Sequence, residues 1–344
     1  MKSVGIAGAS GYMGGEALRV LLRHPEVKLA WASSRTPGPA EAVHPDLCGA
    51  SVELIHPDDA TPCDVVFLAS LPTAVAAAAA RHWLAGDARV IDLGAAFRLH
   101  DRATWERVYG EPHPAWDLAG EAVYGVPELH RDEIARARLI ANPGCFSSAA
   151  ILGLAPLLRA GWIDPAHVVV DGLSGSAGMG AEPSRVAHHA ELGGNLIPYH
   201  AVAHRHTFEM EQELSALAGK PVRVCFTPVY VPIVRGILDL CHVFPTAPRS
   251  RAELLALYRE FYAEAPFVHV WDQPVASDSS WRHEPYPWVS AVAGTNQCQI
   301  GIDVDRERGC IVILSVLDSL GKGGAQVGVE NMNLMLGVPR QAGL

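Results

Sequence analysis

The fold is decided by one stretch near the start of the chain, Lys2-Ser3-Val4-Gly5-Ile6-Ala7-Gly8-Ala9-Ser10-Gly11-Tyr12-Met13-Gly14-Gly15. Its first half is a short apolar run, and its second half is a glycine-rich turn. Residues 16–23 then have helical spacing of leucine and alanine, and residues 27–33 form a second apolar run. The stretch therefore predicts a β-α-β unit whose turn can bring backbone amides close to a pyrophosphate.

The same alternation continues as far as Cys145 and predicts a parallel sheet. After Cys145 the character changes, because long strand-like runs follow one another and a Gly/Ser/His-rich stretch covers residues 174–206. We therefore expect a nucleotide-binding unit followed by an α+β domain that begins near Cys145. The further expected strands are 64–69, 89–93, 139–141, 168–171, 222–228, 234–244, 299–304 and 310–317; the expected helices are 74–84, 147–158, 251–264 and 323–336; and residues 271–288 are expected to form a loop.

Composition excludes several classes of protein. The chain has 344 residues and a formal net charge of −10, which argues against a nucleic-acid partner. No apolar run approaches the roughly 18 residues of a membrane span, so no membrane partner is expected. The seven cysteines are scattered and include no CxxC pair, which indicates a protein of the reducing cytoplasm.

The residues after the second expected strand bear on the choice of cofactor. Proteins that bind NAD usually place an acidic residue there, but this chain has Ser33-Ser34-Arg35. Small hydroxyls and an arginine suit a 2′-phosphate, so the pattern favours NADP. Two alternatives stay open: the glycine-rich turn at residues 8–15 could be a tight turn that binds nothing, and Arg35 could be a solvated surface residue.

Cys145 follows Asn142-Pro143-Gly144 and precedes a helix that we expect to begin near Phe146 or Ser147. A thiol at a helix N-terminus is favoured as thiolate by the dipole and the exposed amides. The same amides can stabilise an oxyanion on an attached acyl group. The alternative is a small buried residue without a chemical role.

His204-Arg205-His206 is the second candidate group. On a strand, alternate histidines would share a face and could bind a metal ion. A general acid/base histidine beside a substrate-binding arginine is another reading, and polar loop residues are a third.

Eight further segments carry a resemblance to a known family. The chain resembles the N-acetyl-γ-glutamyl-phosphate reductases of arginine biosynthesis, which are related to aspartate-semialdehyde dehydrogenase. The matching segments are Gly8-Ala9-Ser10-Gly11-Tyr12, Asp92-Leu93-Gly94-Ala95-Ala96-Phe97-Arg98-Leu99, Tyr124-Gly125-Val126-Pro127-Glu128-Leu129, Asn142-Pro143-Gly144-Cys145, His204-Arg205-His206-Thr207, Arg235-Gly236-Ile237, Gly294-Thr295-Asn296 and Val329-Glu330-Asn331-Met332-Asn333-Leu334-Met335-Leu336-Gly337.

The resemblance implies an architecture and a set of roles. It implies a Rossmann domain over residues 1–145, completed by a C-terminal helix in about 322–344, and an α+β catalytic and oligomerisation domain over 146–321. Cys145 matches the nucleophile and His204 the acid/base. The implied substrate-binding residues are Arg98, Asn142, Ser174, Gly175, Arg205 and Glu209. The implied cofactor-binding residues are Gly8, Ser10, Gly11, Tyr12, Met13, Ser34, Arg35, Ser70, Pro72, Gly178, Asn296 and Lys322; no metal site is implied.

The resemblance also implies a reaction. The Cys145 thiolate would attack a small acyl phosphate, phosphate would leave, and NADPH would reduce the thioester to an aldehyde. The implied partner is a second or further copy of the chain, in a homodimer or homotetramer.

One departure from the family pattern bears on the substrate. The active-site loop of the family often ends in arginine, whereas here it reads Ser174-Gly175-Ser176-Ala177-Gly178-Met179-Gly180-Ala181-Glu182. Ser184 and His188-His189-x-Glu191 resemble sister enzymes of lysine biosynthesis, which reduce a carrier-protein-linked aminoadipyl phosphate. Asn142-Pro143-Gly144-Cys145-Phe146 and Glu209-Met210-Glu211-Gln212 favour the glutamyl substrate.

Three readings of other kinds stay open on the sequence. The chain could be a sensor that binds NADP without turning it over, which an intact Cys145 and His204 disfavour. It could be a metal-dependent hydrolase that uses His188, His189, His204 and His206. It could also be an aspartate-semialdehyde dehydrogenase, which the histidine triplet disfavours.

Overall fold

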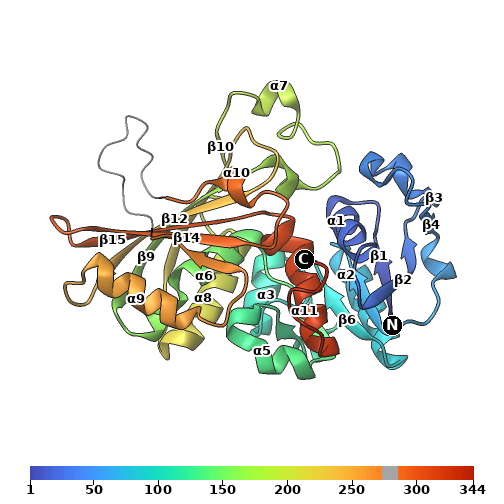
Figure 1. Cartoon of the computed structure of the whole chain (residues 1–344), viewed down its shortest axis with the longest axis horizontal. Coiled ribbons are helices and arrows are strands. Elements are labelled where there is room, and N and C mark those ends of the chain that lie inside the picture. Colours follow the sequence, from blue (N-terminus) through green and yellow to red (C-terminus); the bar gives the residue numbers. More distant parts are fainter. Residues whose placement is uncertain (273–285) are drawn as a thin grey trace. The chain divides into compact units, whose positions relative to one another are not determined.

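The computed structural model describes residues 1–272 and 286–344 and divides the chain into two compact units (Figure 1). Unit 1 consists of Met1–Pro143, Gly180–Glu182 and Gly324–Leu344, and unit 2 consists of Gly144–Met179 and Pro183–Gly323. The first division lies two residues before the expected boundary, and the last lies two residues after it. Most of the expected 271–288 loop lies outside the described residues.

Unit 1 is built on an eight-stranded sheet in the order β3-β4-β2-β1-β5-β6-β8-β7. All its strand pairs are parallel except β3 with β4. The strands are β1 (Lys2–Ala7), β2 (Val27–Ser33), β3 (Gly38–Pro39), β4 (Glu53–Ile55), β5 (Val65–Leu68), β6 (Arg89–Asp92), β7 (Val123–Tyr124) and β8 (Leu139–Ala141). Strands β1 and β2 continue outward from one side of β5 while β6 and β8 continue from the other, which is the doubly wound arrangement expected from the alternation of strands and helices.

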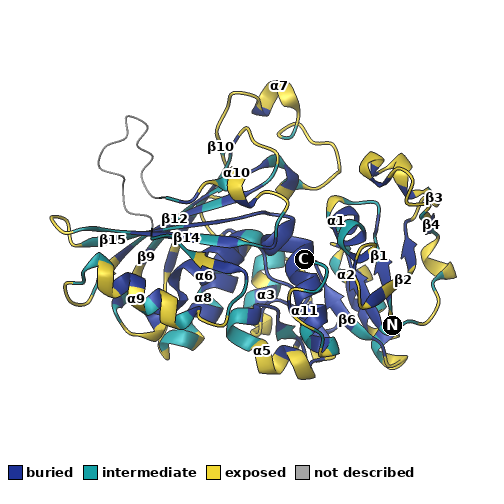
Figure 2. Cartoon of the chain, viewed as in Figure 1, coloured by how far each residue is buried: buried dark blue, intermediate teal, exposed yellow. Residues whose placement is uncertain are grey.

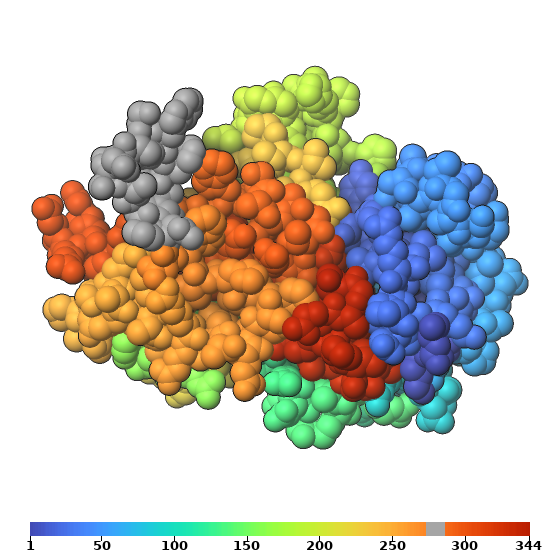
Figure 3. Space-filling model, in the orientation of Figure 1, coloured from blue at the N-terminus to red at the C-terminus, as the bar shows by residue number. Residues whose placement is uncertain are grey.

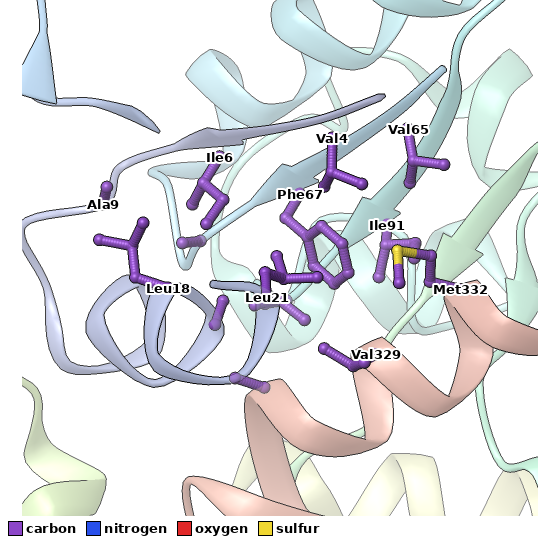
Figure 4. Packing of buried hydrophobic residues seen from close by; sticks show 14 of the residues in the cluster. Val4, Ile6, Ala9, Leu18, Leu21, Val65, Phe67, Ile91, Val329 and Met332 are labelled. Atoms are coloured by element: carbon purple, nitrogen blue, oxygen red, sulfur yellow. The ribbon is translucent and has the colours of Figure 1, made fainter. Parts of the chain in front are cut away.

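Helices cover both faces of the unit 1 sheet, and β5 shows why. Phe67 points into a core shared with Leu18, Leu21 and Met332, as Figure 4 shows. Its neighbours Val66 and Leu68 point into a second core on the other face. A strand buried on both faces reads as a continuous apolar run, which is why β5 has no polar alternation. The helices are α1 (Tyr12–Leu21), α2 (Thr73–Ala85), α3 (Arg102–Tyr109), α4 (Trp116–Ala119), α5 (Pro127–Arg136) and α11 (Gln326–Leu336).

The C-terminal helix α11 belongs to unit 1, although it is more than 180 residues from β8 in sequence. It packs against α1 and α5. In Figure 3 the C-terminal residues, in red, lie directly against the N-terminal residues, in blue. The expected helix over 323–336 is therefore present in part, because residues Gly321–Ala325 form a wider π-type turn before α11 begins.

Unit 2 is built on a seven-stranded mixed sheet in the order β10-β11-β9-β12-β15-β14-β13. The strands are β9 (Ile163–Ser174), β10 (Ile197–Pro198), β11 (Val224–Tyr230), β12 (Ile237–Pro245), β13 (Val268–Val270), β14 (Cys298–Asp305) and β15 (Cys310–Leu317). The helices are α6 (Cys145–Arg159), α7 (His189–Leu192), α8 (Arg205–Ala218), α9 (Arg251–Phe261) and α10 (Val289–Val292). Helices α6, α8 and α9 lie on one side of this sheet (Figure 1).

The two faces of the unit 2 sheet differ in burial (Figure 2). Along β12, the residues that face α6 are fully buried, and the alternate residues Leu238, Leu240 and His242 are only half-buried. The same alternation runs along β15, where Val312 and Leu314 are half-buried. One face of the sheet is therefore the core of unit 2, and the other is an apolar face that keeps partial exposure.

Candidate active site

Cys145 is the first residue of α6, one or two residues earlier than expected. Gly144 stands at the N-cap with an extended backbone (φ −72°, ψ 150°), and the cap carries no side-chain hydrogen bond. The N–H groups of a first helical turn have no partner within their own helix, and the positive end of the dipole lies among them. The half-buried Cys145 thiol therefore sits where negative charge is stabilised.

Glycines on both sides let other groups approach this thiol. A Cβ on Gly323 would lie 2.9 Å from the Cβ of Cys145, and a Cβ on Gly144 would overlap the ring of His206. No residue larger than glycine fits at these positions without displacing a neighbour. The sequence motif Asn142-Pro143-Gly144-Cys145 thus has a steric reason for its glycine.

The carboxylate of Glu209 is held in place by neighbouring groups of the protein. Its Oε2 accepts a hydrogen bond of 3.0 Å from the N–H of Gly144, and its Oε1 lies 3.9 Å from Nε2 of His206. Both side chains are buried, and both lie in the first turns of α8. The carboxylate, expected to bind substrate, here connects α8 to the N-cap of α6; its role toward substrate stays a prediction.

His204 stands at the N-cap of α8, so the histidine triplet lies at a helix start and not on a strand. Its Nδ1 accepts a hydrogen bond of 3.2 Å from the N–H of His206. Its ring packs edge-on against Phe146, Tyr199 and Phe226, at centroid distances of 6.2, 5.6 and 5.3 Å. Burial lowers the pKa of His204 to about 4, and the charges of Arg205 and His200 act in the same direction.

The structure adds a tyrosine pair that sequence reasoning missed. The rings of Tyr199 and Tyr230 are stacked with centroids 4.1 Å apart and planes 4° apart. Burial raises the pKa of both hydroxyls, and negative charge at Cys145 raises both further, whereas Arg205 lowers them. The pair therefore lies within electrostatic reach of both Cys145 and Arg205. No local signal marks it, because its two members come from the loop before α8 and from the end of β11.

The other predicted residues of unit 2 form two groups around the end of the sheet. Ser174 ends β9, and its hydroxyl bonds to the carbonyl of Gly175 at 3.0 Å. Gly175 is packed so closely on the backbone of Val234 that a Cβ would lie 2.6 Å from its carbonyl oxygen. Gly178 is exposed, while Asn296 and Lys322 are buried, the latter with Nζ 5.6 Å from the Phe267 ring.

A buried carboxylate organises the segments near Asn296 and Lys322. Asp318 accepts hydrogen bonds from Arg235 Nε at 2.8 Å, from the N–H of Leu320 at 2.9 Å and from the N–H of Gly294. The family motifs Arg235-Gly236-Ile237 and Gly294-Thr295-Asn296, far apart in sequence, are thus held together by one side chain.

The nucleotide loop of unit 1 has the geometry that a pyrophosphate requires. The N–H groups of Gly8 and Ala9 donate to the carbonyl of Ser33, and α1 begins at Tyr12, four residues earlier than expected. Gly8 has φ +85°, and a Cβ on Gly14 would lie 2.5 Å from Cα of Ala9. By contrast, a Cβ on Gly11 would come only within 4.0 Å of the Gly8 carbonyl. The loop is therefore tightly packed at Gly8 and Gly14 and open at Gly11, and an open backbone at a helix N-terminus is a common setting for phosphate binding.

The remaining cofactor-binding candidates lie at the carboxyl ends of β2 and β5. The buried Ser34 accepts a hydrogen bond of 3.2 Å from the N–H of Thr36, and Arg35 is exposed. Ser70 is exposed with φ +54°, and Pro72 is the N-cap of α2. Tyr12 is exposed, and Ser10 and Met13 are half-buried in the loop. In a parallel sheet the carboxyl ends of the strands form the ligand edge, so unit 1 brings these candidates to one edge.

Arg98 and Asn142 belong to unit 1, unlike the other substrate-binding candidates. Arg98 is buried and donates to the carbonyl of Leu93 at 3.4 Å. It lies near Asp92, whose pKa is raised to about 6 by burial. The amide of Gly94 and the charge of Arg98 act in the opposite direction and lower this pKa. Asn142 donates to the carbonyl of Gly324 at 3.0 Å and accepts from Asn331 at 3.3 Å, which ties the end of β8 to α11.

The described residues contain neither a metal-binding cluster nor a membrane-spanning helix. Within residues 1–272 and 286–344, no group of three or more His, Cys, Asp or Glu side chains is placed to hold a metal ion. Over the same residues no helix combines the length and apolarity needed to cross a bilayer.

Comparisons with known proteins cover the whole chain. A family described as "Semialdehyde dehydrogenase, dimerisation domain" matches residues 145–319, and "Semialdehyde dehydrogenase, NAD binding domain" matches residues 3–137. Over 350 residues the chain is 42% identical to an N-acetyl-gamma-glutamyl-phosphate reductase of Moorella thermoacetica, with 100% of this chain and 98% of that protein aligned. The chain belongs to the N-acetyl-γ-glutamyl-phosphate reductase family. It is therefore an oxidoreductase of the semialdehyde dehydrogenase type.

The chain is also similar to a reductase with another substrate in its name and, in fold, to aspartate semialdehyde dehydrogenase structures. The chain is 41% identical over 348 residues to a putative [LysW]-L-2-aminoadipate/[LysW]-L-glutamate phosphate reductase of Cenarchaeum symbiosum, with 99% of this chain and 97% of that protein aligned. An aspartate semialdehyde dehydrogenase structure from Francisella tularensis has a TM-score of 0.70 at 15% identity, covering 98% of this chain and 100% of that chain. The predictions of an α/β fold with a Rossmann unit, of the family and of an enzyme are confirmed.

Proposed function

We propose that this chain reduces N-acetyl-γ-glutamyl phosphate to N-acetylglutamate 5-semialdehyde and phosphate with NADPH, in arginine biosynthesis. The observation that carries the proposal is the placement of Cys145 on the first turn of α6, in a chain 42% identical over its full length to a reductase of that name. The aligned relative, the fold and the position of Cys145 all support one reaction class, the reduction of an acyl phosphate to an aldehyde.

Cys145 is the nucleophile in this proposal. Its thiolate attacks the acyl carbon, a carbon–sulfur bond forms, and the carbon–oxygen bond to phosphate breaks as phosphate leaves with the electron pair. The amides of the first turn of α6 stabilise the negative charge that develops on the acyl oxygen. When bound, NADPH supplies a hydride equivalent to the acyl carbon. Cysteine suits both halves of the reaction, because a thiolate is a good nucleophile and a good leaving group.

The cofactor proposal uses the edge of unit 1. The open backbone at Gly11 and the N-terminus of α1, with Gly8, Ser10, Tyr12 and Met13, hold the pyrophosphate. Ser34 and the exposed Arg35 bind the 2′-phosphate, so NADP(H) is preferred to NAD(H). Further contacts to the cofactor are proposed for Ser70, Pro72, Gly178, Asn296 and Lys322.

The substrate proposal assigns anionic groups to arginines. Arg205 is exposed at the start of α8, and its charge reaches the tyrosine pair beside Cys145. A carboxylate or phosphate there would gain a charge-assisted hydrogen bond and the positive end of the α8 dipole. Ser174, Gly175, Arg98, Asn142 and Glu209 complete the proposed substrate set.

A second candidate substrate rests on the loop after β9. Residues 174–182 lack the arginine common in the arginine enzymes, and the Cenarchaeum symbiosum relative is named for LysW-linked substrates. A carrier-linked aminoadipyl phosphate is therefore the alternative. The segment offers Arg185, but its guanidinium already pairs with Glu191 at 3.2 Å, which leaves little positive charge for an acidic carrier protein.

A homodimer or homotetramer in the cytoplasm completes the proposal. The half-buried apolar face of the unit 2 sheet is what an interface between copies would bury, and the matched family carries "dimerisation domain" in its description. None of the seven cysteines is joined in a disulfide, which suits a reducing compartment.

A reverse assay tests the proposal. Purified protein with NADP, phosphate and N-acetylglutamate semialdehyde is expected to show phosphate-dependent absorbance gain at 340 nm. Cys145→Ser is expected to abolish the signal while NADPH still binds, since an alkoxide is far harder to form than a thiolate. Turnover by Cys145→Ser would overturn the mechanism. No activity with this aldehyde, in a folded protein that binds NADPH, would favour the carrier-linked substrate or a sensor.

A further inference from the structure

The carbonyl of Ala9, in the nucleotide loop of unit 1, is held by His44, a residue outside the glycine-rich motif. Nε2 of His44 lies 2.7 Å from this carbonyl oxygen. A carbonyl oxygen can only accept, so Nε2 carries the proton and donates. The imidazole is buried, and a Cβ on Gly15 would lie 2.4 Å from its Cε1 atom. His44 therefore contacts the loop at both ends, at Ala9 and at the first turn of α1.

His44 is itself fixed by a short segment of unit 1 that lies between β3 and β4 in the chain. The segment contains two 3₁₀ turns, η1 (Ala40–Ala42) and η2 (Pro45–Leu47). Ala40 and Leu47 are buried in the same apolar core as α1. The N–H of His44 donates to the carbonyl of Ala40 at 2.8 Å, and the carbonyl of His44 accepts from Leu47 at 2.9 Å. The imidazole is therefore presented to the loop by a backbone that is bonded on both sides.

The bond from His44 sets the direction of one peptide plane. In a trans peptide the C=O and the following N–H point in opposite directions, and residues 1–272 and 286–344 contain no cis peptide bond. The Ala9 carbonyl points to His44, so the N–H of Ser10 points away from His44. The N–H of Ala9 already donates to the carbonyl of Ser33 at 2.8 Å, whereas the N–H of Ser10 makes no hydrogen bond to the residues that the structure describes. The Ser10 amide is therefore a donor that a ligand at the loop could use.

We propose that His44 is a positioning residue for the cofactor: by holding the Ala9 carbonyl, it turns the N–H of Ser10 toward the pyrophosphate of NADP(H). The inference rests on the cofactor site of the proposed function. Without a donor at position 44, the peptide between Ala9 and Ser10 is free to flip, because a buried carbonyl without a partner is unfavourable. The flipped peptide presents a carbonyl to the phosphate in place of an amide, and binding weakens.

Two substitutions at position 44 separate the donor from the ring. His44→Phe keeps a ring against Gly15 but has no donor, and His44→Gln supplies an N–H donor again. Kd of NADPH is measured by cofactor fluorescence on the full chain without substrate. We expect His44→Phe to raise this Kd about 10- to 100-fold, and His44→Gln to keep it within about threefold of the original protein. At saturating NADPH, kcat of His44→Phe should stay within about threefold of the original, because His44 touches no reacting atom.

His24→Phe is the matched control. His24 is also a buried histidine of unit 1, with Nε2 2.9 Å from Oδ1 of Asn333, but it follows the C-terminal end of α1. Its substitution should leave the Kd of NADPH unchanged, whereas a general loosening of unit 1 would weaken binding in both variants. Adenosine 2′-monophosphate, which has no pyrophosphate, is a control on the ligand. Its Kd, measured by calorimetry, should be the same in His44→Phe and the original protein.

A measurement on the original protein does not depend on how any variant folds. Hydrogen exchange resolved to single residues should show that bound NADPH slows exchange at the Ser10 amide.

Three results would overturn the inference: unchanged exchange at Ser10 on binding NADPH, an unchanged Kd of NADPH in a folded His44→Phe, or an equal loss of affinity for adenosine 2′-monophosphate. An original protein that does not bind NADPH would remove the cofactor from the proposed function and the inference with it. If NADPH binds and its Kd depends on His44, but no acyl phosphate is reduced, the proposed reaction fails while the inference stands.

Discussion

Gly144 is the residue at which three parts of the candidate site meet. Its N–H donates to Glu209, its Cα faces the ring of His206, and the next residue is Cys145. Because Glu209 and His206 are both buried in the same helix, neither ring nor carboxylate can move far without disturbing α8. The position of Cys145, the proposed nucleophile, is therefore set by the glycine that precedes it.

Gly144→Ala is expected to destabilise the protein by about 1–3 kcal/mol, because the added methyl overlaps the His206 ring in a packed site. It should also lower kcat, since the turn before Cys145 must shift. Urea unfolding and the 340 nm assay measure the two effects. Gly120→Ala is the control: its Cβ would lie 3.7 Å from the Asp117 carbonyl, an ordinary contact, so stability should hold. Equal stability of the two variants would contradict the steric account.

Arg35 is the positively charged residue that the proposal places at the end of β2, where the 2′-phosphate would bind. It is exposed, so its substitution should leave the fold intact. Arg35→Ala is expected to lower the ratio of kcat/KM for NADPH to that for NADH by about tenfold or more, since a charge-assisted bond to phosphate is lost. Arg23→Ala, on another exposed arginine, serves as control. An unchanged cofactor ratio would remove Arg35 from the 2′-phosphate site.

At the scale of the element, strand β12 carries a carboxyl group, Asp239, on the face that it buries in the core of unit 2. There its oxygens make no well-formed hydrogen bond to a described residue, and only the backbone amide of Ala150 favours its charged form. Burial raises its pKa well above the ordinary value. The folded chain therefore retains a proton that the unfolded chain loses above pH ~4, so stability falls as pH rises toward the folded pKa.

Asp239→Asn removes this cost. The advantage of the variant in free energy of unfolding should grow as pH rises above the ordinary carboxyl pKa, by up to about 1.4 kcal/mol per pH unit as long as the folded carboxyl keeps its proton. Urea titrations at three pH values measure it. Glu307→Gln, on an exposed turn, should show no such trend. A difference independent of pH would mean that Asp239 is ionised in the fold.

At the scale of the whole molecule, assembly is proposed to use the half-buried face of the unit 2 sheet. Leu240 and Leu314 are directly opposed on this face, in neighbouring antiparallel strands. Leu240→Asp should shift the protein to a monomer in size-exclusion chromatography with light scattering, because an interface cannot bury an unpaired charge cheaply. Leu196→Asp, on an exposed loop, should leave the assembly unchanged. An unaltered oligomer with a native circular dichroism spectrum in Leu240→Asp would place the interface elsewhere.

Local patterns in the sequence predicted the longer strands of both sheets but missed the short strands β3, β4, β7, β10 and β13. Strands β1, β2, β8 and β15 have the expected bounds, because the residues that each strand buries form an apolar run or alternation that is visible in the sequence. Helix starts were less predictable. Both α1 and α6 begin earlier than expected, since their first turns, Tyr12-Met13-Gly14-Gly15 and Cys145-Phe146-Ser147-Ser148, are too short and too rich in glycine or serine to show a helical apolar period.

The sequence by itself therefore determined the fold class and the family and marked Cys145 as the candidate nucleophile, because each of these follows from short motifs in a fixed order along the chain. The tertiary structure alone decided what surrounds that nucleophile. Glu209 meets an amide 65 residues away, Tyr199 stacks on Tyr230, and His204 is an N-cap rather than part of a strand. These relations depend on how α6, α8 and β11 pack, and packing of distant segments leaves no periodic trace along the chain.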